Sequence, residues 1–139
     1  MLPKNQDPNT KNQIRSKDQM PSAKPKVFDL QPRTLQFAKD VRDFVKVLPR
    51  TVSNLEDIKQ LVRASGSVGA NYIEANEALG KKDFAMHIKI SRKEAKESRF
   101  WLNLVDVGSD RRLVLQRQEL EEEASAFIKI FSAILSKVE

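Results

Sequence analysis

The spacing of the apolar residues constrains this chain more than any other feature of its sequence. From Val27 onward, apolar residues recur at steps of three and four residues in four segments, and no segment has the alternation of a β-strand. A helix that carries such a stripe buries it against other helices. The pattern therefore predicts an all-α protein, an antiparallel up-and-down four-helix bundle with short loops.

Prolines and turn residues predict where three of these helices begin and end. The first helix is expected from about Pro32 to Leu48 and is stopped by Pro49, because proline suits the first turn of a helix but not its interior. The third helix is expected at about 82–105, before a Gly-Ser-Asp turn. The fourth is expected at about 113–138.

Two signals bound the second helix. Ser53 and Glu56 have the spacing of a capping box, in which each side chain accepts a hydrogen bond from the backbone N–H of the other residue. The apolar stripe then continues to about Leu79, and Gly80 is a plausible C-terminal stop. The sequence thus predicts a helix from Ser53 to about Leu79.

The N-terminal segment differs in composition from the remainder. Residues 1–26 contain four prolines, many Asn, Gln, Ser and Lys, and a net charge of +4 out of the total of +6. Because such a segment buries too little apolar surface to offset its ordering entropy, we expect residues 1–26 to be a disordered basic tail and residues 27–139 to be the bundle domain. The tail is either a solvated linker or a basic arm that contacts nucleic acid or an acidic partner.

The composition argues against several classes of function. The chain has no Cys and a single His, His87, which leaves no disulfide, no thiolate nucleophile and few ligands for a metal. No segment resembles a transmembrane helix or a signal peptide. We therefore expect a cytoplasmic protein with no membrane association, no cofactor, no metal and no enzymatic activity. His87 itself is expected to be a satisfied side chain at the edge of the core.

The third predicted helix carries the feature with most functional content. Projection at about 100° per residue gathers six basic residues in one sector. They are Lys82, Lys89, Arg92, Lys93, Lys96 and Arg99. Such a sector is either a solvated bundle face or a surface that binds phosphates. The opposite apolar arc is wider than one bundle seam needs, which favours self-association.

Two carboxylates, Glu94 and Glu97, lie at neighbouring positions beside this apolar arc. A di-metal carboxylate site would need two Glu-x-x-His motifs, and the chain has one His in all. We expect these carboxylates to pair with a basic residue of another helix or protomer, for which Arg63 is a candidate, or to remain solvated at a helix edge.

Gly66 and Gly69 project onto the apolar stripe of the second helix. Glycine inside a helix costs about 0.5–1 kcal/mol relative to alanine, so close approach of a neighbouring helix is the expected compensation. The run from Ala64 to Asn71 matches neither of the two glycine-rich phosphate-binding motifs, Gly-x-x-x-x-Gly-Lys-Ser/Thr and Gly-x-Gly-x-x-Gly, and no predicted strand precedes it. We therefore expect a packing role for both glycines.

The block from Leu61 to Val105 also resembles the 23S rRNA intervening sequence protein family, a group of bacterial four-helix bundle proteins. The matching elements are Arg63, the run Ser67–Asn71, Glu74-Ala75, Lys82-Asp83-Phe84, and the pattern Glu94-Ala95, Glu97-Ser98 and Trp101-Leu102. The resemblance covers about residues 28–138. Many members carry Pro where Gly69 stands here, and the 26-residue extension is not typical of the family.

The resemblance implies a left-handed bundle that assembles as a ring, commonly a homopentamer, with no catalytic activity. Distantly similar accessory proteins of retroelements form basic pentamers that bind RNA and a reverse transcriptase. Our leading hypothesis is a non-enzymatic oligomeric bundle that binds RNA or an RNA-associated protein through the basic sector. The alternative is a protein-binding scaffold with no nucleic-acid role. The expected structural or oligomer contacts are Arg63, Gly66, Gly69, Glu94, Glu97 and Trp101.

Overall fold

Four helices account for most of residues 29–139, the range that this computed structural model describes. They are α1 (Gln31–Val45), α2 (Val52–Asn76), α3 (Lys81–Leu104) and α4 (Arg111–Val138). No strand occurs within these residues, so the predicted all-α class is confirmed. The predicted disordered tail, residues 1–26, lies outside the described range, and the domain boundary at residue 27 stays a prediction.

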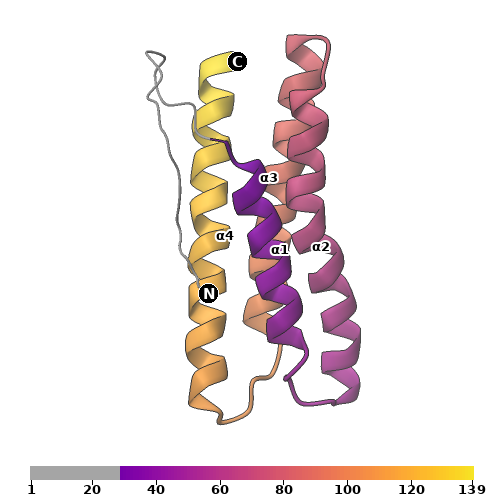
Figure 1. Ribbon diagram of the computed structural model, residues 1–139, viewed down its shortest axis with the longest axis vertical. Coiled ribbons are helices and arrows are strands. Elements are labelled where there is room, and N and C mark those ends of the chain that lie inside the picture. Colours follow the sequence, from indigo (N-terminus) through magenta and orange to yellow (C-terminus); the bar gives the residue numbers. More distant parts are fainter. Residues whose placement is uncertain (1–28) are drawn as a thin grey trace, which may run out of the picture.

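The helices form the predicted antiparallel, up-and-down bundle (Figure 1). Each helix packs against its neighbour in the chain, and α1 also packs against α4, whereas the backbones of the diagonal pairs do not approach each other closely. The α2–α3 and α3–α4 seams are the most extensive. Because α1 has only 15 residues and the other helices have 24–28, α2, α3 and α4 extend beyond its first residue (Figure 1).

Aromatic side chains fill the core between α1, α2 and α4. The rings of Phe37 and Phe127 meet edge to face with their centroids 5.5 Å apart, and Phe131 stacks on Phe127 at 6.1 Å. Tyr72 of α2 extends this cluster, with its ring 6.3 Å from that of Phe131. Full burial of each such side chain stabilises the fold by about 1.5–3 kcal/mol. The apolar stripes read from the sequence thus face one another.

The predicted end of the first helix was three residues too late. The helix stops at Val45, and Val47 and Leu48 form tighter turns through backbone hydrogen bonds to Phe44 and Val45. The physical reason is Pro49, since the residue before a proline is disfavoured in helical conformation. Leu48 nevertheless reaches the core and is buried outside the helix.

The predicted capping box at Ser53 was wrong. The cap lies two residues earlier, at Thr51, whose side chain accepts a hydrogen bond from the backbone N–H of Asn54 at 3.1 Å, and the helix begins at Val52. Ser53 lies inside the first turn and is exposed. Thr51 and Ser53 are both good capping types, so the choice rests on where Asn54 has to lie.

Asn54 is that deciding residue, because its buried side chain joins two loops at one end of the bundle. Its amide nitrogen donates to the carbonyl oxygens of Pro49 at 3.0 Å and Asp106 at 2.8 Å. Its amide oxygen accepts from the backbone N–H of Asp106 at 2.9 Å. The α1–α2 loop and the α3–α4 loop are therefore held together by one side chain.

The predicted role of Gly80 as a helix stop was also wrong. The second helix ends at Asn76, with Glu77 as its C-cap, and Gly80 is the N-cap of α3 in extended conformation. A stop glycine adopts the left-handed conformation, and Gly80 does not. Leu79, expected as the last residue of the stripe, is fully exposed in the connecting turn.

Candidate nucleic-acid interface

The six basic residues predicted to share a sector of α3 lie on its outer face and on the side that faces α4. Lys82, Lys89, Lys93, Lys96 and Arg99 are exposed, and Arg92 is half-buried. The regular 24-residue helix gathers them, because residues three, four and seven apart occupy one face. The structure therefore brings the predicted set together as one surface, which we call the α3 basic face.

Half of this face is tied to α4. Lys89 donates from Nζ to the Glu139 carboxylate at 2.7 Å. Arg92 and Arg99 each donate from Nη1 to a serine hydroxyl of α4, Ser132 and Ser125 respectively, at 3.2 Å. A hydroxyl orients a guanidinium without neutralising it, so both arginines keep their charge available.

The other half has no such partner. Within residues 29–139, Lys82, Lys93 and Lys96 form no ion pair, although acidic side chains are common on the neighbouring helix. An exposed ammonium without a counter-charge can bind a phosphate without first breaking an ion pair. These three lysines are therefore the ammonium groups of the α3 basic face that are not paired with a carboxylate among the described residues.

A shallow groove of about 570 Å³ runs along the end of this face. Its lining residues are Lys96, Arg99, Phe100, Asn103, Leu104 and Glu121. The Phe100 side chain is 58% exposed, and its ring meets that of Trp101 edge to face at 5.0 Å. Trp101 in turn packs against the core, so it supports the ring of Phe100 from below.

The carboxylates of α3 pair within the chain. Arg63 of α2 donates from Nη2 to Glu94 at 3.2 Å and to Glu97 at 3.0 Å. The Glu94 side chain is only 8% exposed and Glu97 is 41% exposed. One guanidinium thus pairs with two neighbouring carboxylates across the α2–α3 seam, and the group keeps one net negative charge. Among the described residues, no group of His, Asp and Glu is arranged to hold a metal ion.

The single histidine lies at the edge of the same seam. His87 is half-buried, with Nδ1 3.4 Å from the Asn71 amide oxygen and Nε2 3.6 Å from the Asp83 carboxylate. No hydroxyl is placed to serve as a nucleophile among the partners that the structure gives it. The geometry is that of a positioned side chain between two helices.

The two predicted packing glycines differ in their surroundings. A Cβ atom at Gly69 would lie 2.7 Å from Thr34 Oγ1, so α1 approaches the α2 backbone there as expected. A Cβ atom at Gly66 would meet only Arg42 Nη2, at an ordinary 3.6 Å. Close approach therefore explains Gly69 and does not explain Gly66.

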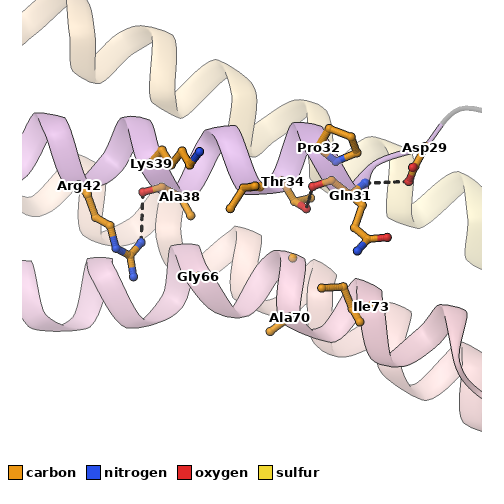
Figure 2. A pocket seen from close by; sticks show the side chains of 12 residues that line it. Asp29, Gln31, Pro32, Thr34, Ala38, Lys39, Arg42, Gly66, Ala70 and Ile73 are labelled. Carbon is orange, nitrogen blue, oxygen red and sulfur yellow. Dashed lines mark hydrogen bonds between the residues drawn. The ribbon is translucent and has the colours of Figure 1, made fainter.

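Gly66 instead borders an open groove of about 640 Å³ between α1 and α2 (Figure 2). Ala38, Ala70, Leu35 and Ile73 give this groove an apolar floor, and the last two side chains are about half exposed. Arg42 lies along its edge and donates to the carbonyl of Ala38 at 3.1 Å. We call this surface the α1–α2 groove.

Most side chains of the wide apolar arc on the third predicted helix are buried in the core of the single chain. Ile88, Ala95, Leu102 and Val105 are buried, and Trp101 packs on the core. Leu104 remains half exposed. The prediction that the arc mediates self-association stays a prediction, as does an oligomer contact for Trp101.

Sequence reasoning missed one polar contact that closes the bundle. Arg33 of α1 donates from Nε and Nη2 to the two carboxylate oxygens of Glu123 on α4, both at 2.7 Å. This hydrogen-bonded pair raises the pKa of Arg33 above its usual value. The guanidinium also lies 5.3 Å over the ring of Phe127. Nothing in the sequence relates positions so far apart, except that both flank the predicted apolar stripes.

A model of the 23S rRNA-intervening sequence protein family matches residues 28–132. The chain belongs to this family. A crystal structure from Bacteroides thetaiotaomicron, of a protein of unknown function from the S23 ribosomal protein family, is 27% identical with a TM-score of 0.66. The match covers 77% of this chain and 98% of that one. No curated protein matches the chain.

Family membership confirms the resemblance read from the sequence. The matched range contains the whole of α1, α2 and α3 and most of α4, so it includes the α3 basic face and the α2–α3 ion pairs. None of the helices in residues 29–139 is long and apolar enough to cross a lipid bilayer.

Proposed function

We propose that this protein is a non-enzymatic, cytoplasmic bundle that binds RNA, alone or within a ribonucleoprotein, through the α3 basic face. The observation that carries the proposal is the group of exposed lysines that form no ion pair within residues 29–139, namely Lys82, Lys93 and Lys96. The bundle domain has a net charge of only +2, so its total charge does not supply the attraction. The attraction comes instead from a local group of charges, because exposed charges act over about one Debye length, roughly 8–10 Å in physiological salt.

The two arginines extend this surface toward α4. Arg92 and Arg99 are each held by a serine hydroxyl, so their orientation is set before RNA arrives. A guanidinium can donate two parallel hydrogen bonds to one phosphate, whereas an ammonium acts as a point charge. The lysines would then attract the backbone and the arginines would fix its position.

A salt titration tests the proposal. RNA binding should weaken steeply between about 50 and 200 mM salt, and each lysine–phosphate contact contributes about 0.7 to the slope on a single strand. The double charge reversal Lys93→Glu and Lys96→Glu should therefore lower that slope by about 1.4 and weaken binding at low salt. Fluorescence anisotropy of a labelled RNA measures both quantities.

A matched control uses two lysines elsewhere. Lys46 and Lys59 are also exposed, but each forms an ion pair with a carboxylate three residues away in the sequence. Charge reversal of both changes the net charge by the same amount and should leave most of the affinity. No RNA binding by the wild type at low salt, or equal losses in the two double variants, would refute the proposal.

We also propose that the protein assembles from several identical copies, with the family's five-membered ring as the expected form. Apolar side chains that remain exposed outside the α3 basic face, such as Val52 and Leu55 of α2, support a further contact surface. Light scattering at micromolar concentration tests the assembly. A monomeric wild type contradicts it.

The α1–α2 groove supports a second candidate function, a scaffold that binds proteins and has no nucleic-acid role. Its half-exposed Leu35 and Ile73 give an apolar strip between two helices, of the kind into which an amphipathic helix packs. Leu35→Glu should then abolish a protein interaction and leave RNA binding unchanged. Leu115→Glu, at an equally exposed leucine of α4, is the matched control.

A further inference from the structure

Phe100 is the one large aromatic side chain of residues 29–139 that is more than half exposed, and it lies on the α3 basic face. A single exposed apolar residue is ordinary on a protein surface. Phe100 differs because its neighbours one and two helical turns away are Lys96 and Lys93, which form no ion pair within the described residues. Exposed aromatic surface next to positive charge is the combination that binds unpaired nucleotides.

The ring of Phe100 is supported. Its edge-to-face contact with Trp101 has an interplanar angle of 81°, and Trp101 packs on the core. Edge-to-face contact of this kind favours one mutual orientation of the two rings. A base that stacks on Phe100 would therefore meet a ring whose orientation is already set, which lowers the ordering cost of binding.

The groove beside Phe100 has charge of opposite sign on its two sides. Lys96 and Arg99 come from α3, and Glu121 comes from α4. A phosphate is attracted to the α3 side and repelled from the carboxylate, so the backbone of a strand should follow α3. Asn103, with both donors and an acceptor, and Glu121, as an acceptor, remain for the polar edge of a base.

The distances along the helix suit this arrangement. With a rise of about 1.5 Å per residue, Lys96 lies about 6 Å and Lys93 about 10 Å along α3 from Phe100. A strand that places one base on Phe100 can thus place its adjacent phosphates near both lysines. A duplex cannot do so, because its bases are stacked on each other and their faces are hidden.

We propose that Phe100 and the groove next to it form a stacking site for an unpaired base, so that the RNA bound by the α3 basic face is single-stranded. This inference rests on the proposed function and narrows its substrate class. Duplex RNA would contact the lysines alone and would bind more weakly than a single strand at equal salt.

The test compares Phe100→Leu, Phe100→Tyr and wild type on a labelled single-stranded oligouridine and on a duplex RNA of equal length. Leucine keeps apolar area and loses the aromatic face, whereas tyrosine keeps the face. Stacking on one aromatic ring contributes about 5- to 150-fold in affinity. Phe100→Leu should lose that factor on the single strand only, with an unchanged salt slope, and Phe100→Tyr should bind like wild type.

The protein carries its own reporter of the contact. Trp101 is its only tryptophan and lies against Phe100. Binding of an unlabelled single strand should quench Trp101 fluorescence in the wild type, and the duplex should not. Leu115→Ala, at a similarly exposed apolar residue of α4, is the control for a change of surface area and should bind both RNAs like wild type.

The outcomes separate the two proposals. If the wild type binds no RNA at low salt, both fail. If it binds single strand and duplex equally, and Phe100→Leu binds as tightly as wild type, the stacking site is overturned while the electrostatic proposal stands. An acidic polyglutamate peptide that binds as tightly as the single strand, with the same salt slope and the same indifference to Phe100→Leu, also overturns it and indicates a protein partner.

Discussion

Gly66 and Gly69 lie three residues apart in one helix, and the same substitution should have opposite effects at the two sites. At Gly66 an added Cβ meets only the end of a flexible arginine at 3.6 Å. Alanine is favoured over glycine by about 0.5–1 kcal/mol inside a helix. Gly66→Ala should therefore stabilise the protein by about that amount, which raises Tm by about 2–4 °C in a chain of this size.

At Gly69 the added Cβ would lie 2.7 Å from Thr34 Oγ1 and 3.1 Å from Thr34 Cβ. Thr34 is a buried, β-branched residue whose hydroxyl donates to the Gln31 carbonyl at 3.1 Å, so it cannot give way without losing that bond. Overpacking of this kind costs about 1–3 kcal/mol, and the gain in helix propensity offsets only part of it. Gly69→Ala should destabilise by about 1–2 kcal/mol.

Denaturation followed by far-UV circular dichroism measures both variants, at one protein concentration because assembly shifts Tm. A double-variant cycle with Thr34→Ala locates the cause. That change removes Oγ1, so Gly69→Ala in its background should recover at least about 1 kcal/mol, while Gly66→Ala should add independently. Equal stabilisation by both alanines would refute the close approach of α1 to α2.

Three further predictions concern stability, and denaturant titration checks each. Arg63→Ala should cost about 2 kcal/mol and Glu97→Ala less than 1 kcal/mol, because loss of the arginine leaves a buried carboxylate without its cation; equal costs would contradict this. Asn54→Ala should lower the free energy of unfolding by about 2–4 kcal/mol, because it leaves backbone groups of both loops without their hydrogen-bond partner. A loss below about 1 kcal/mol would argue against the role of Asn54 in holding the two loops together. Thr51→Ala should lower the free energy of unfolding by about 1 kcal/mol, and Ser53→Ala should leave it almost unchanged. A larger loss for Ser53→Ala than for Thr51→Ala would support the predicted cap at Ser53.

The sequence predicted the class of fold because apolar spacing is a property of each helix by itself. The stripes that contain Phe37 and Phe127 could be recognised without knowing what they pack against. Helix ends were less predictable, since Thr51 and Ser53 satisfy the same local rule and the contacts of Asn54 with Pro49 and the distant Asp106 favour one of them. Local sequence signals permit several helix boundaries, and tertiary contacts determine which of them forms.

The α3 basic face was likewise only partly predictable from the sequence. That six basic residues share one face of α3 follows from helical periodicity alone. Which of them carry an available charge does not, because the ion pair of Lys89 with Glu139 depends on the register of α3 against α4. The orientation of Arg92 by Ser132 depends on the same register. The Arg33–Glu123 pair was missed for the same reason, since no local pattern connects residues on the first and last helices.

The side chain of Asn54 makes the two ends of the bundle unequal in what they can tolerate. At one end, a single amide binds both loops, so an insertion in either loop must displace the other. At the opposite end, the turn of residues 77–80 is largely exposed and no side chain bridges it to another loop among the contacts described. New chain termini, or an inserted domain, should therefore be accepted between Glu77 and Gly80 and rejected near Asp106.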